Sequence, residues 1–368
     1  MRTPAPHTIG MDLFDLETPA LVLDVGAAER NIRRLAEIVR QSGKRLRPHT
    51  KTHKTPLLAH KQIAAGAVGV CCAKLGEVEV MVAGGVPDIL LTSEIVSRAA
   101  IARLIAAARH ARIGIVVDDA ECATAIAAAA QAAGLTLPTY VDVNVGQDRT
   151  GVAPGEPTVA LARHVAGLRG LELAGLQAYE GHLQHVVAAE ERETKARGAM
   201  QLVAETRRLL AGAGLPVGIV TTGGTGTHAT ILASDAADEV QAGSYVVMDA
   251  HYGTVAGLEF EHALTVLTSI VSHTRADTAI TDAGLKTLST DSGMPVVKDR
   301  PDLSYAFGGD EHGKIGLREA RSGLKLGDKL EVIPSHCDTT INLHDFYYVG
   351  RDGKLEAVWP IAARGRIQ

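Results

Sequence analysis

The sequence predicts an α/β protein in which a (β/α)₈ barrel is followed by a mostly antiparallel β domain. Eight short apolar runs alternate with longer Ala-rich stretches between residues 46 and 243, and Gly or Pro marks many of the junctions. After residue 250 the Ala-rich helical pattern disappears and short β-rich runs replace it. A doubly wound open sheet is the alternative. The barrel is favoured because eight strands close a barrel and several runs carry polar residues at inward positions.

The expected elements follow from hydrophobic periodicity. Residues 18–24 are an opening strand, and residues 25–42 have a helical pattern. Residues 99–109, 120–133 and 190–213 have helical length and helix-favouring composition. The eight barrel strands are expected at residues 46–51, 68–73, 88–92, 113–118, 139–145, 173–179, 218–222 and 238–243.

The second domain is expected to be built from short strands separated by turns. Its strands are expected at residues 263–272, 278–282, 329–333, 346–349 and 355–360. The change of pattern at residue 250 predicts a barrel domain over 18–250. A β domain is expected over 251–368, which the tail 1–17 joins.

Composition excludes several classes of protein. Of the 368 residues, 46% are hydrophobic and 3% aromatic, so the core must be globular and aliphatic. The net charge of −5 argues against a nucleic-acid or anionic-membrane surface. The four cysteines form no CxxC pair, which favours a reducing cytoplasm. No signal pattern or run of about 18 apolar residues occurs, so we expect a cytoplasmic protein without membrane partners.

A basic block follows the start of the first barrel strand, with the sequence Arg-Pro-His-Thr-Lys-Thr-His-Lys over residues 47–54. Strand periodicity puts Arg47, His49 and Lys51 on one inward face, with Lys51 at the rim where barrel enzymes bind substrate. Neighbouring cations and desolvation would lower the pKa of Lys51 and favour its nucleophilic form. The alternative is a solvated basic loop.

Two glycine-containing loops follow the last two barrel strands. Residues 221–227 read Thr-Thr-Gly-Gly-Thr-Gly-Thr, and Gly243 begins the triplet Gly-Ser-Tyr. Glycine allows backbone N–H groups to approach an anion, and these positions are the usual phosphate site of the barrel. Ordinary turns are the alternative for each loop. Together with a lysine able to form a Schiff base, the loops favour pyridoxal 5′-phosphate (PLP) as the cofactor.

A candidate metal pair lies in the second domain, where His336 and Asp338 flank Cys337. On an extended segment the two would project the same way and could share one divalent ion such as Mn²⁺, Mg²⁺, Co²⁺ or Zn²⁺. Two protein ligands would leave positions open for water and substrate. A turn with a surface His and Asp is the alternative.

Polar residues also end two central strands. Arg149 follows the strand expected at 139–145, and Gln177 and Tyr179 share one face of the strand at 173–179. His182 and His185 lie just beyond. A histidine at the barrel rim can act as a general base near neutral pH, although a packed or exposed histidine is the alternative.

These blocks resemble the fold-type III PLP enzymes, and within them the group of D-threonine aldolases, 3-hydroxy-D-aspartate aldolases and D-serine dehydratases. The resemblance runs over nearly the whole chain. The basic block and the metal pair together make it specific, whereas the glycine loop alone would not. The matching segments are residues 18–24, 47–54, 72–77, 144–151, 179–185, 223–227, 282–287 and 336–338.

The resemblance implies an alanine-racemase-like barrel with a C-terminal β domain, usually in a homodimer with the active site near the domain and subunit boundary. Lys51 aligns with the lysine that binds PLP, with Lys54 as the competing candidate. His185 aligns with the proposed base. The resemblance further implies that Arg149 and Tyr179 hold the cofactor ring and that His336 and Asp338 bind the metal. The residues expected to bind the phosphate are Gly224, Thr225, Gly243 and Tyr245.

Two departures narrow the choice within the group. The alanine racemases place an Arg against the pyridine nitrogen, and Gln241 stands at that position here. Dehydratase relatives tend to pair the metal-binding His with a Cys, whereas here the partner is Asp338 and Cys337 would lie on the opposite face. A hard carboxylate ligand favours Mn²⁺- or Mg²⁺-like chemistry, as in the aldolases, and Mn²⁺ is the expected ion.

The expected activity is therefore cleavage of a D-β-hydroxy-α-amino acid to glycine and an aldehyde, of D-threonine aldolase type. The alternatives are a 3-hydroxy-D-aspartate aldolase, which yields glyoxylate, and a D-serine or 3-hydroxyaspartate dehydratase. A racemase would need a second base, and a PLP carrier would lack the second domain. D-Threonine, D-phenylserine and 3-hydroxy-D-aspartate remain open as substrates. A carboxylate substrate would require a cation such as Lys286, Lys314 or His312.

Overall fold

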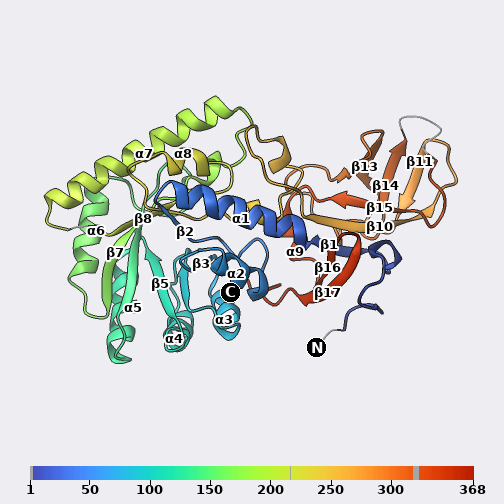
Figure 1. The fold of residues 1–368 in the computed structure, drawn as a ribbon. Helices are drawn as coiled ribbons and strands as arrows, with labels where there is room; N and C mark the ends of the chain where they lie inside the picture. The colour runs from blue at the N-terminus through green and yellow to red at the C-terminus, as the bar shows by residue number, and fades with distance from the viewer. Residues whose placement is uncertain (1–2, 216, 318–322) are drawn as a thin grey trace. The chain divides into compact units, whose positions relative to one another are not determined.

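The computed structural model describes residues 3–215, 217–317 and 323–368 (Figure 1). Contacts between residues divide the chain into two units. We call the unit of Arg34–Lys51, Pro56–Gly243 and Arg366–Gln368 the barrel unit. The β unit comprises Ser244–Gly365, Thr52–Thr55 and the described part of Met1–Arg33. Each unit is described in turn.

The barrel unit is built on a sheet of eight strands, all paired in parallel. The order across the sheet is β2-β9-β8-β7-β6-β5-β4-β3, so neighbours in the sheet are also neighbours in sequence apart from β2 and β9. The strands are β2 (Arg45–Leu46), β3 (Val70–Cys72), β4 (Asp88–Leu91), β5 (Arg112–Val117), β6 (Leu137–Asp142), β7 (Leu171–Gln177), β8 (Ile219–Thr222) and β9 (Glu239–Val240).

The backbone that follows β2 closes this sheet into a barrel. On one side, the N–H groups of Arg47 and His49 donate to carbonyls of β9 and its continuation, at 2.9 and 3.0 Å. On the other side, the N–H of Cys71 donates to Pro48 O and the N–H of Thr50 donates to Cys71 O, both at 2.8 Å. All eight expected strands are present, and the predicted (β/α)₈ barrel is confirmed.

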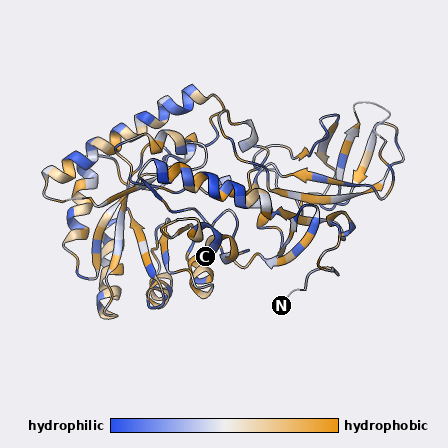
Figure 2. Ribbon diagram, in the orientation of Figure 1, coloured by the Kyte–Doolittle hydropathy of each residue, from blue (hydrophilic) through white to orange (hydrophobic). Residues whose placement is uncertain are grey.

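Helices follow the barrel strands in the alternation that the sequence predicts (Figure 1). Ser97 and Asp119 cap α4 and α5, because each side chain accepts a hydrogen bond from a backbone N–H of the first turn. Figure 2 shows apolar strands surrounded by helices of mixed polarity. These helices are α2 (Pro56–Ala64), α3 (Leu75–Ala83), α4 (Arg98–Ala107), α5 (Ala120–Ala132), α6 (Glu156–Ala166), α7 (Ala189–Gly212) and α8 (His228–Leu232). The helix α1 (Val25–Gln41) precedes β2, and its residues are divided between the two units at Arg33.

The barrel interior is polar at both ends and apolar between them. At the strand beginnings, Arg47 is buried and pairs with Glu239 at 2.9 Å and with Asp88 at 2.5 Å. A middle layer of apolar side chains fills the barrel, and Tyr140 supplies its aromatic bulk. The layer consists of Cys71, Leu90, Val116 and Tyr140, with Ala174 and Ile219 packed against them. The strand ends carry the polar residues of the candidate site.

The β unit contains a nine-stranded sheet in which only β1 and β16 pair in parallel among the described strands. The predicted mostly antiparallel β domain is therefore confirmed. The opening strand β1 pairs with β10 and β16, so it belongs to the β unit. The two units are therefore not separated by a single boundary at residue 250. The strands are β1 (Ala20–Asp24), β10 (Leu264–Ser272), β11 (Thr278–Thr281), β12 (Val296–Val297), β13 (Leu303–Phe307), β14 (Gly313–Leu317), β15 (Lys329–Ile333), β16 (Phe346–Arg351) and β17 (Lys354–Pro360).

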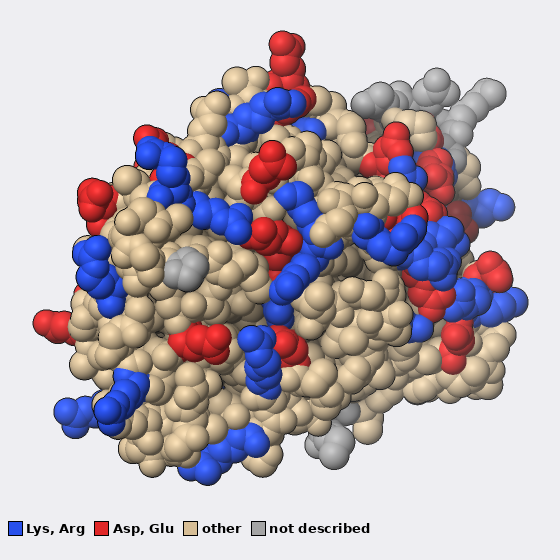
Figure 3. Space-filling model, turned by 60° about the vertical axis from the view of Figure 1, so that its left-hand side comes forward, with Lys and Arg blue, Asp and Glu red and all other residues tan. Residues whose placement is uncertain are grey.

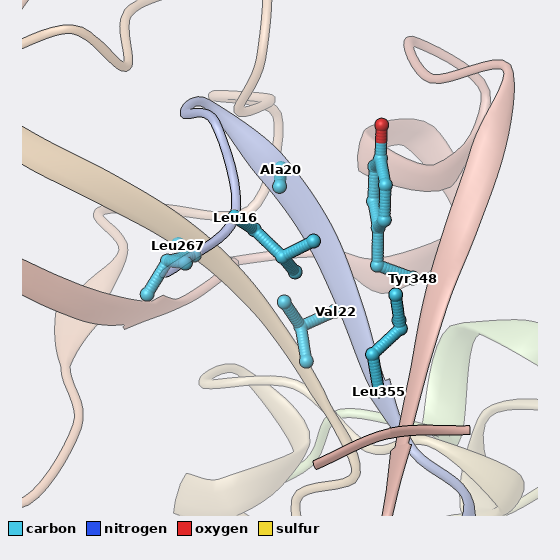
Figure 4. Close-up of a cluster of buried hydrophobic side chains, with 6 residues drawn as sticks. All are labelled: Leu16, Ala20, Val22, Leu267, Tyr348 and Leu355. Carbon is cyan, nitrogen blue, oxygen red and sulfur yellow. The ribbon is translucent and has the colours of Figure 1, made fainter. Parts of the chain in front are cut away.

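One apolar cluster holds the N-terminal segment to this sheet (Figure 4). Leu16 and Val22 pack with Leu267 of β10 and Tyr348 of β16, and each is at most 7% exposed. Leu355 of β17 and Ala20 complete the cluster. Burial of these side chains explains why residues that precede the first barrel strand fold into the β unit. The short helix α9 (Cys337–Ile341) follows β15.

The surface carries charges of both signs. Figure 3 shows Lys and Arg side chains interspersed with Asp and Glu on the face in view, without a broad area of one sign. Within the described residues, no helix has both the length and the apolar character needed to cross a membrane.

The buried ion pairs of Arg47 predict a stability defect. Arg47→Met is expected to lower the free energy of unfolding by about 3–5 kcal/mol, because the fully buried Glu239 would lose its compensating charge. Arg112→Met is the matched control, since Arg112 pairs with the same Asp88 but its side chain is 54% exposed. This substitution should lower the free energy of unfolding by at most about 1 kcal/mol. Denaturant unfolding of both variants measures the difference, and equal losses would contradict the prediction.

Candidate active site

Two side chains from two other barrel loops meet at the ring of Tyr179. The Nζ of Lys51 and the Cζ of Arg149 each lie 5.9 Å from the centroid of that ring. Lys51 follows β2, Arg149 lies in the loop after β6, and Tyr179 lies two residues beyond β7. Two cations over one aromatic ring form a cationic rim at the strand ends. The structure thus brings together three of the residues selected from the sequence.

The expected influence of Arg47 on Lys51 is wrong. The inward alternation of Arg47, His49 and Lys51 is present, but Arg47 is neutralised by Glu239 and Asp88 at the opposite end of the strands. Strand pairing brings these acids to Arg47 from β9 and β4, and no local pattern in the sequence reveals them. Arg47 therefore contributes to the barrel interior, and the cation that joins Lys51 at the Tyr179 ring is Arg149.

Hydrogen bonds between side chains connect the ends of the central strands. His49 Nε2 lies 3.1 Å from Thr92 Oγ1, and Gln177 Nε2 donates to Asp142 Oδ1 at 2.9 Å. Gln241 Nε2 donates to Thr221 Oγ1 at 2.9 Å and to Gln177 Oε1 at 3.3 Å. The donated bonds fix the orientation of the Gln241 amide, a neutral group at the position where the sequence indicated a departure from the racemases.

An acidic group at the same strand ends was missed by the sequence analysis. Glu94 follows β4 and lies near Asp142, the last residue of β6, and Asp118, which follows β5. Burial, followed by the negative charges of Asp142 and Asp118, raises the pKa of Glu94 to about 7. Adjacent barrel strands bring the three acids together although they are far apart in the sequence.

The glycine loop after β8 packs closely on the chain itself. The N–H of Gly224 donates to Thr227 Oγ1 at 3.2 Å, and a Cβ on Gly224 would lie only 2.5 Å from Gln184 Oε1. Gly223 has a φ of +78°, which favours glycine. Thr225 is buried, and its carbonyl oxygen lies 2.8 Å from His228 Nδ1. Glycine is thus required here for close packing as well as for any approach of an anion.

The other residues selected for the cofactor lie in different parts of the chain. Gly243 is the last residue of its segment of the barrel unit, whereas Tyr245 belongs to the short turn Ser244–Val246 of the β unit. The ring of Tyr245 is fully buried and contacts Phe260 edge-on at 5.6 Å. His185 is half-buried just after the turn Gly181–Leu183.

The remaining candidates are Lys54, the alternative lysine for PLP, and the three cations considered for a substrate carboxylate. Lys54 is buried with a φ of +53°, and its carbonyl accepts a hydrogen bond from Ala363 N–H. Lys286 is exposed and pairs with Glu311 at 2.5 Å, which neutralises a cation considered for a carboxylate substrate. Lys314 and His312 are also exposed.

The predicted extended conformation of the metal pair is wrong. His336 is extended, but the next residues form helix α9, and Asp338 lies in its first turn. The cause is a tertiary contact, because the buried carboxylate of Asp249 accepts a hydrogen bond from Cys337 N–H at 2.9 Å. The Cys337 side chain is fully buried, and burial raises the pKa of its thiol.

Asp291 orients the imidazole of His336, and the sequence analysis missed it. His336 Nδ1 lies 2.5 Å from Asp291 Oδ2, and Thr339 Oγ1 donates to Asp291 Oδ1 at 2.8 Å. Burial alone would lower the pKa of His336, but the charges of Asp338 and Asp291 outweigh it and raise that pKa. An aspartate 45 residues away in the sequence gives no local signal of this contact.

The donor sets fit the two groups that the sequence suggested. Because a carboxylate occupies Nδ1 of His336, a metal at this site would bind Nε2, and Asp338 would supply an oxygen donor. Among the described residues, no cluster of three or more His, Cys, Asp or Glu side chains could hold a metal. The two-ligand site therefore requires further ligands from water or substrate. At the barrel rim, Lys51, Arg149 and Tyr179 fit the ring of PLP by charge and aromatic character.

Comparison with known proteins identifies the family. The model of the alanine racemase N-terminal domain matches residues 23–251, and that of a putative serine dehydratase domain matches residues 263–350. A 3-hydroxy-D-aspartate aldolase of Paracoccus denitrificans (strain Pd 1222) is 40% identical over 98% of this chain and 95% of its own. A D-threonine aldolase of Arthrobacter sp is also 40% identical, over 98% of this chain and 96% of its own.

The chain belongs to the family of D-threonine aldolases and 3-hydroxy-D-aspartate aldolases. The solved structure of D-threonine aldolase from Filomicrobium marinum is 42% identical, with a TM-score of 0.96. That match covers 99% of this chain and 100% of the other. Membership of this aldolase family confirms the resemblance inferred from the sequence, including the alanine-racemase-like barrel.

The contact between His336 and Asp291 predicts a shift that titration can measure. Asp291→Asn is expected to lower the pKa of His336 in the metal-free protein, because it removes a charge that stabilises the imidazolium. NMR titration of the histidine ring measures this pKa. Asp302→Asn is the control, since Asp302 pairs with Arg300 in the same unit and should leave His336 unchanged. An unchanged pKa in Asp291→Asn would contradict the assigned contact.

Proposed function

We propose that this protein is a PLP- and divalent-metal-dependent aldolase that cleaves D-β-hydroxy-α-amino acids to glycine and an aldehyde. The observation that carries the proposal is the likeness to a D-threonine aldolase over essentially the full length of both chains. The cationic rim formed by Lys51 and Arg149 around Tyr179 supports it independently.

The barrel unit would hold the cofactor. When bound, PLP supplies the electron sink that allows the Cα–Cβ bond to break. Lys51 would bind the cofactor covalently, and Arg149 and Tyr179 would hold its ring. Gly224, Thr225, Gly243 and Tyr245 are the proposed phosphate-binding residues. Gln241 presents a neutral amide, which does not oppose protonation of a ring nitrogen as a guanidinium does.

The proton of the substrate hydroxyl must be removed as the carbon–carbon bond breaks. We assign this role to the imidazole of His185, which accepts the proton as a general base. The metal would be held by His336 and Asp338, with Asp291 orienting the imidazole, and would supply a Lewis acid that lowers the pKa of the hydroxyl. Mn²⁺ is the proposed ion, because a carboxylate is a hard ligand, with Mg²⁺, Co²⁺ and Zn²⁺ as alternatives.

We further propose that the protein is a cytoplasmic homodimer. All four cysteines are free thiols, which suits a reducing compartment. The dimer rests on the family resemblance.

A 3-hydroxy-D-aspartate aldolase is the second candidate function. Identity to that enzyme and to D-threonine aldolase is the same, at 40%, so identity does not separate the two substrates. The ion pair between Lys286 and Glu311 weighs against Lys286 as the partner of a substrate carboxylate.

Product analysis tests the function. The PLP- and Mn²⁺-loaded protein is incubated with D-threonine, 3-hydroxy-D-aspartate and D-serine, and the products are identified by chromatography. Glycine and acetaldehyde from D-threonine are expected, with activity lost on chelation and restored by Mn²⁺. Glycine and glyoxylate as the main products would support the second candidate. Ammonia and a 2-oxo acid would instead identify a dehydratase and contradict the proposal.

Replacement of the two candidate lysines tests the cofactor attachment. Lys51→Ala is expected to abolish both activity and the visible absorbance of lysine-bound PLP, because it removes the amine proposed to bond the cofactor. Lys54→Gln should retain both, since its backbone carbonyl, not its side chain, makes the bond to Ala363. Retained absorbance in Lys51→Ala, or its loss in Lys54→Gln, would reverse the assignment.

A further inference from the structure

A buried carboxylate lies directly beneath the glycine loop. Glu180 follows Tyr179 and is fully buried. Its Oε2 accepts hydrogen bonds from Thr222 Oγ1 at 2.9 Å and from Gly223 N–H at 3.2 Å. Its Oε1 accepts from Thr227 Oγ1 at 2.5 Å and from Gln184 Nε2 at 3.3 Å. Of these four donors, Thr222 ends β8, and Gly223 and Thr227 lie at the two ends of the loop that follows, so one carboxylate binds both ends of the loop.

Gln184, one helical turn beyond Glu180, binds the middle of the same loop. Its Oε1 accepts from Gly226 N–H at 2.9 Å, and its Nε2 donates to Thr227 Oγ1 at 3.0 Å. A Cβ at Gly224 or Gly226 would collide with Gln184. The loop is therefore shaped on two buried side chains of the segment that follows β7.

We propose that Glu180 is a positioning residue that sets the loop 222–227 in the conformation that binds the cofactor phosphate. The segment from Tyr179 to His185 carries both Glu180 and Gln184, so the same bonds couple the loop to the proposed ring and base residues. This inference rests on the proposed binding of PLP. It adds a residue that makes no contact with the cofactor and acts only through the loop.

Charge and position predict opposite effects, which makes the role testable. A carboxylate has the same sign as a phosphate, so by Coulomb repulsion alone its removal would strengthen phosphate binding. Glu180→Gln keeps the size but replaces an acceptor oxygen with an NH₂ group that faces hydrogen-bond donors. If Glu180 acts by positioning the loop, the substitution must reduce the contribution of the phosphate group to the affinity for PLP.

The experiment compares PLP with pyridoxal, which lacks the phosphate. The cofactor-free full-length protein is titrated with each compound, and the visible absorbance of the lysine-bound form gives the two dissociation constants. In Glu180→Gln, we expect the preference for PLP over pyridoxal to fall at least tenfold. A general loss of structure would weaken the binding of both compounds and leave the ratio of their dissociation constants unchanged. Glu172→Gln, an exposed change on β7, is the matched control and should keep the wild-type ratio.

A second pair of variants covers the case in which Glu180→Gln does not fold. Thr227→Val removes the hydroxyl that bonds to Glu180, Gln184 and Gly224 N–H, whereas Thr227→Ser keeps it. The PLP preference should fall in the valine variant and persist in the serine variant. An unchanged or increased ratio in Glu180→Gln would overturn the positioning role. Wild-type protein that binds pyridoxal as tightly as PLP would overturn the phosphate site, and the product analysis reports separately on the aldolase activity.

Discussion

The backbone pairing of residues 46–50 on both sides is the constraint on which the barrel unit depends. One edge of this segment bonds to the continuation of β9 and the other to β3. Because this segment, which continues β2, bonds to both β9 and β3, it closes the otherwise open sheet and leaves the barrel no free edge. The same pairing places Lys51 at the strand ends, where it meets Tyr179 and Arg149. The backbone pairing that closes the sheet thus also positions Lys51 beside Tyr179 and Arg149.

The chain separates its stabilising polar groups from its functional ones. The Arg47 ion pairs lie at the strand beginnings, and a layer of small aliphatic side chains and Tyr140 separates them from the strand ends. Glycine at two positions leaves room in the barrel interior for the ring of Tyr140 and the guanidinium of Arg47. A Cβ at Gly114 would contact the Tyr140 ring at 3.3 Å, and one at Gly69 would lie 2.5 Å from the Arg47 guanidinium. The high glycine content therefore serves the interior as well as the loops.

Carboxylates orient candidate functional residues in each unit, and two of them, Glu180 and Asp249, are buried. Glu180 fixes the glycine loop, while Asp249 begins helix α9 by binding Cys337 N–H. Asp291 holds the imidazole of His336. In each case a residue without an expected chemical role controls the geometry of residues that have one. A group that must hold a ligand in one orientation needs such support.

Local sequence was enough to predict the eight barrel strands, the change to a β domain and the residues of the basic block. These depend on local periodicity and on residue type, which are present in any short window. It missed β12, β13 and β14; β12 has only two residues, and β14 contains two glycines. Only the tertiary structure placed β1 in the second sheet, neutralised Arg47 with acids of two other strands and turned the segment after His336 into a helix. Glu94, Asp291 and Glu180 acquired their partners in the same way, since contacts between residues distant in the chain leave no local signal in a single sequence.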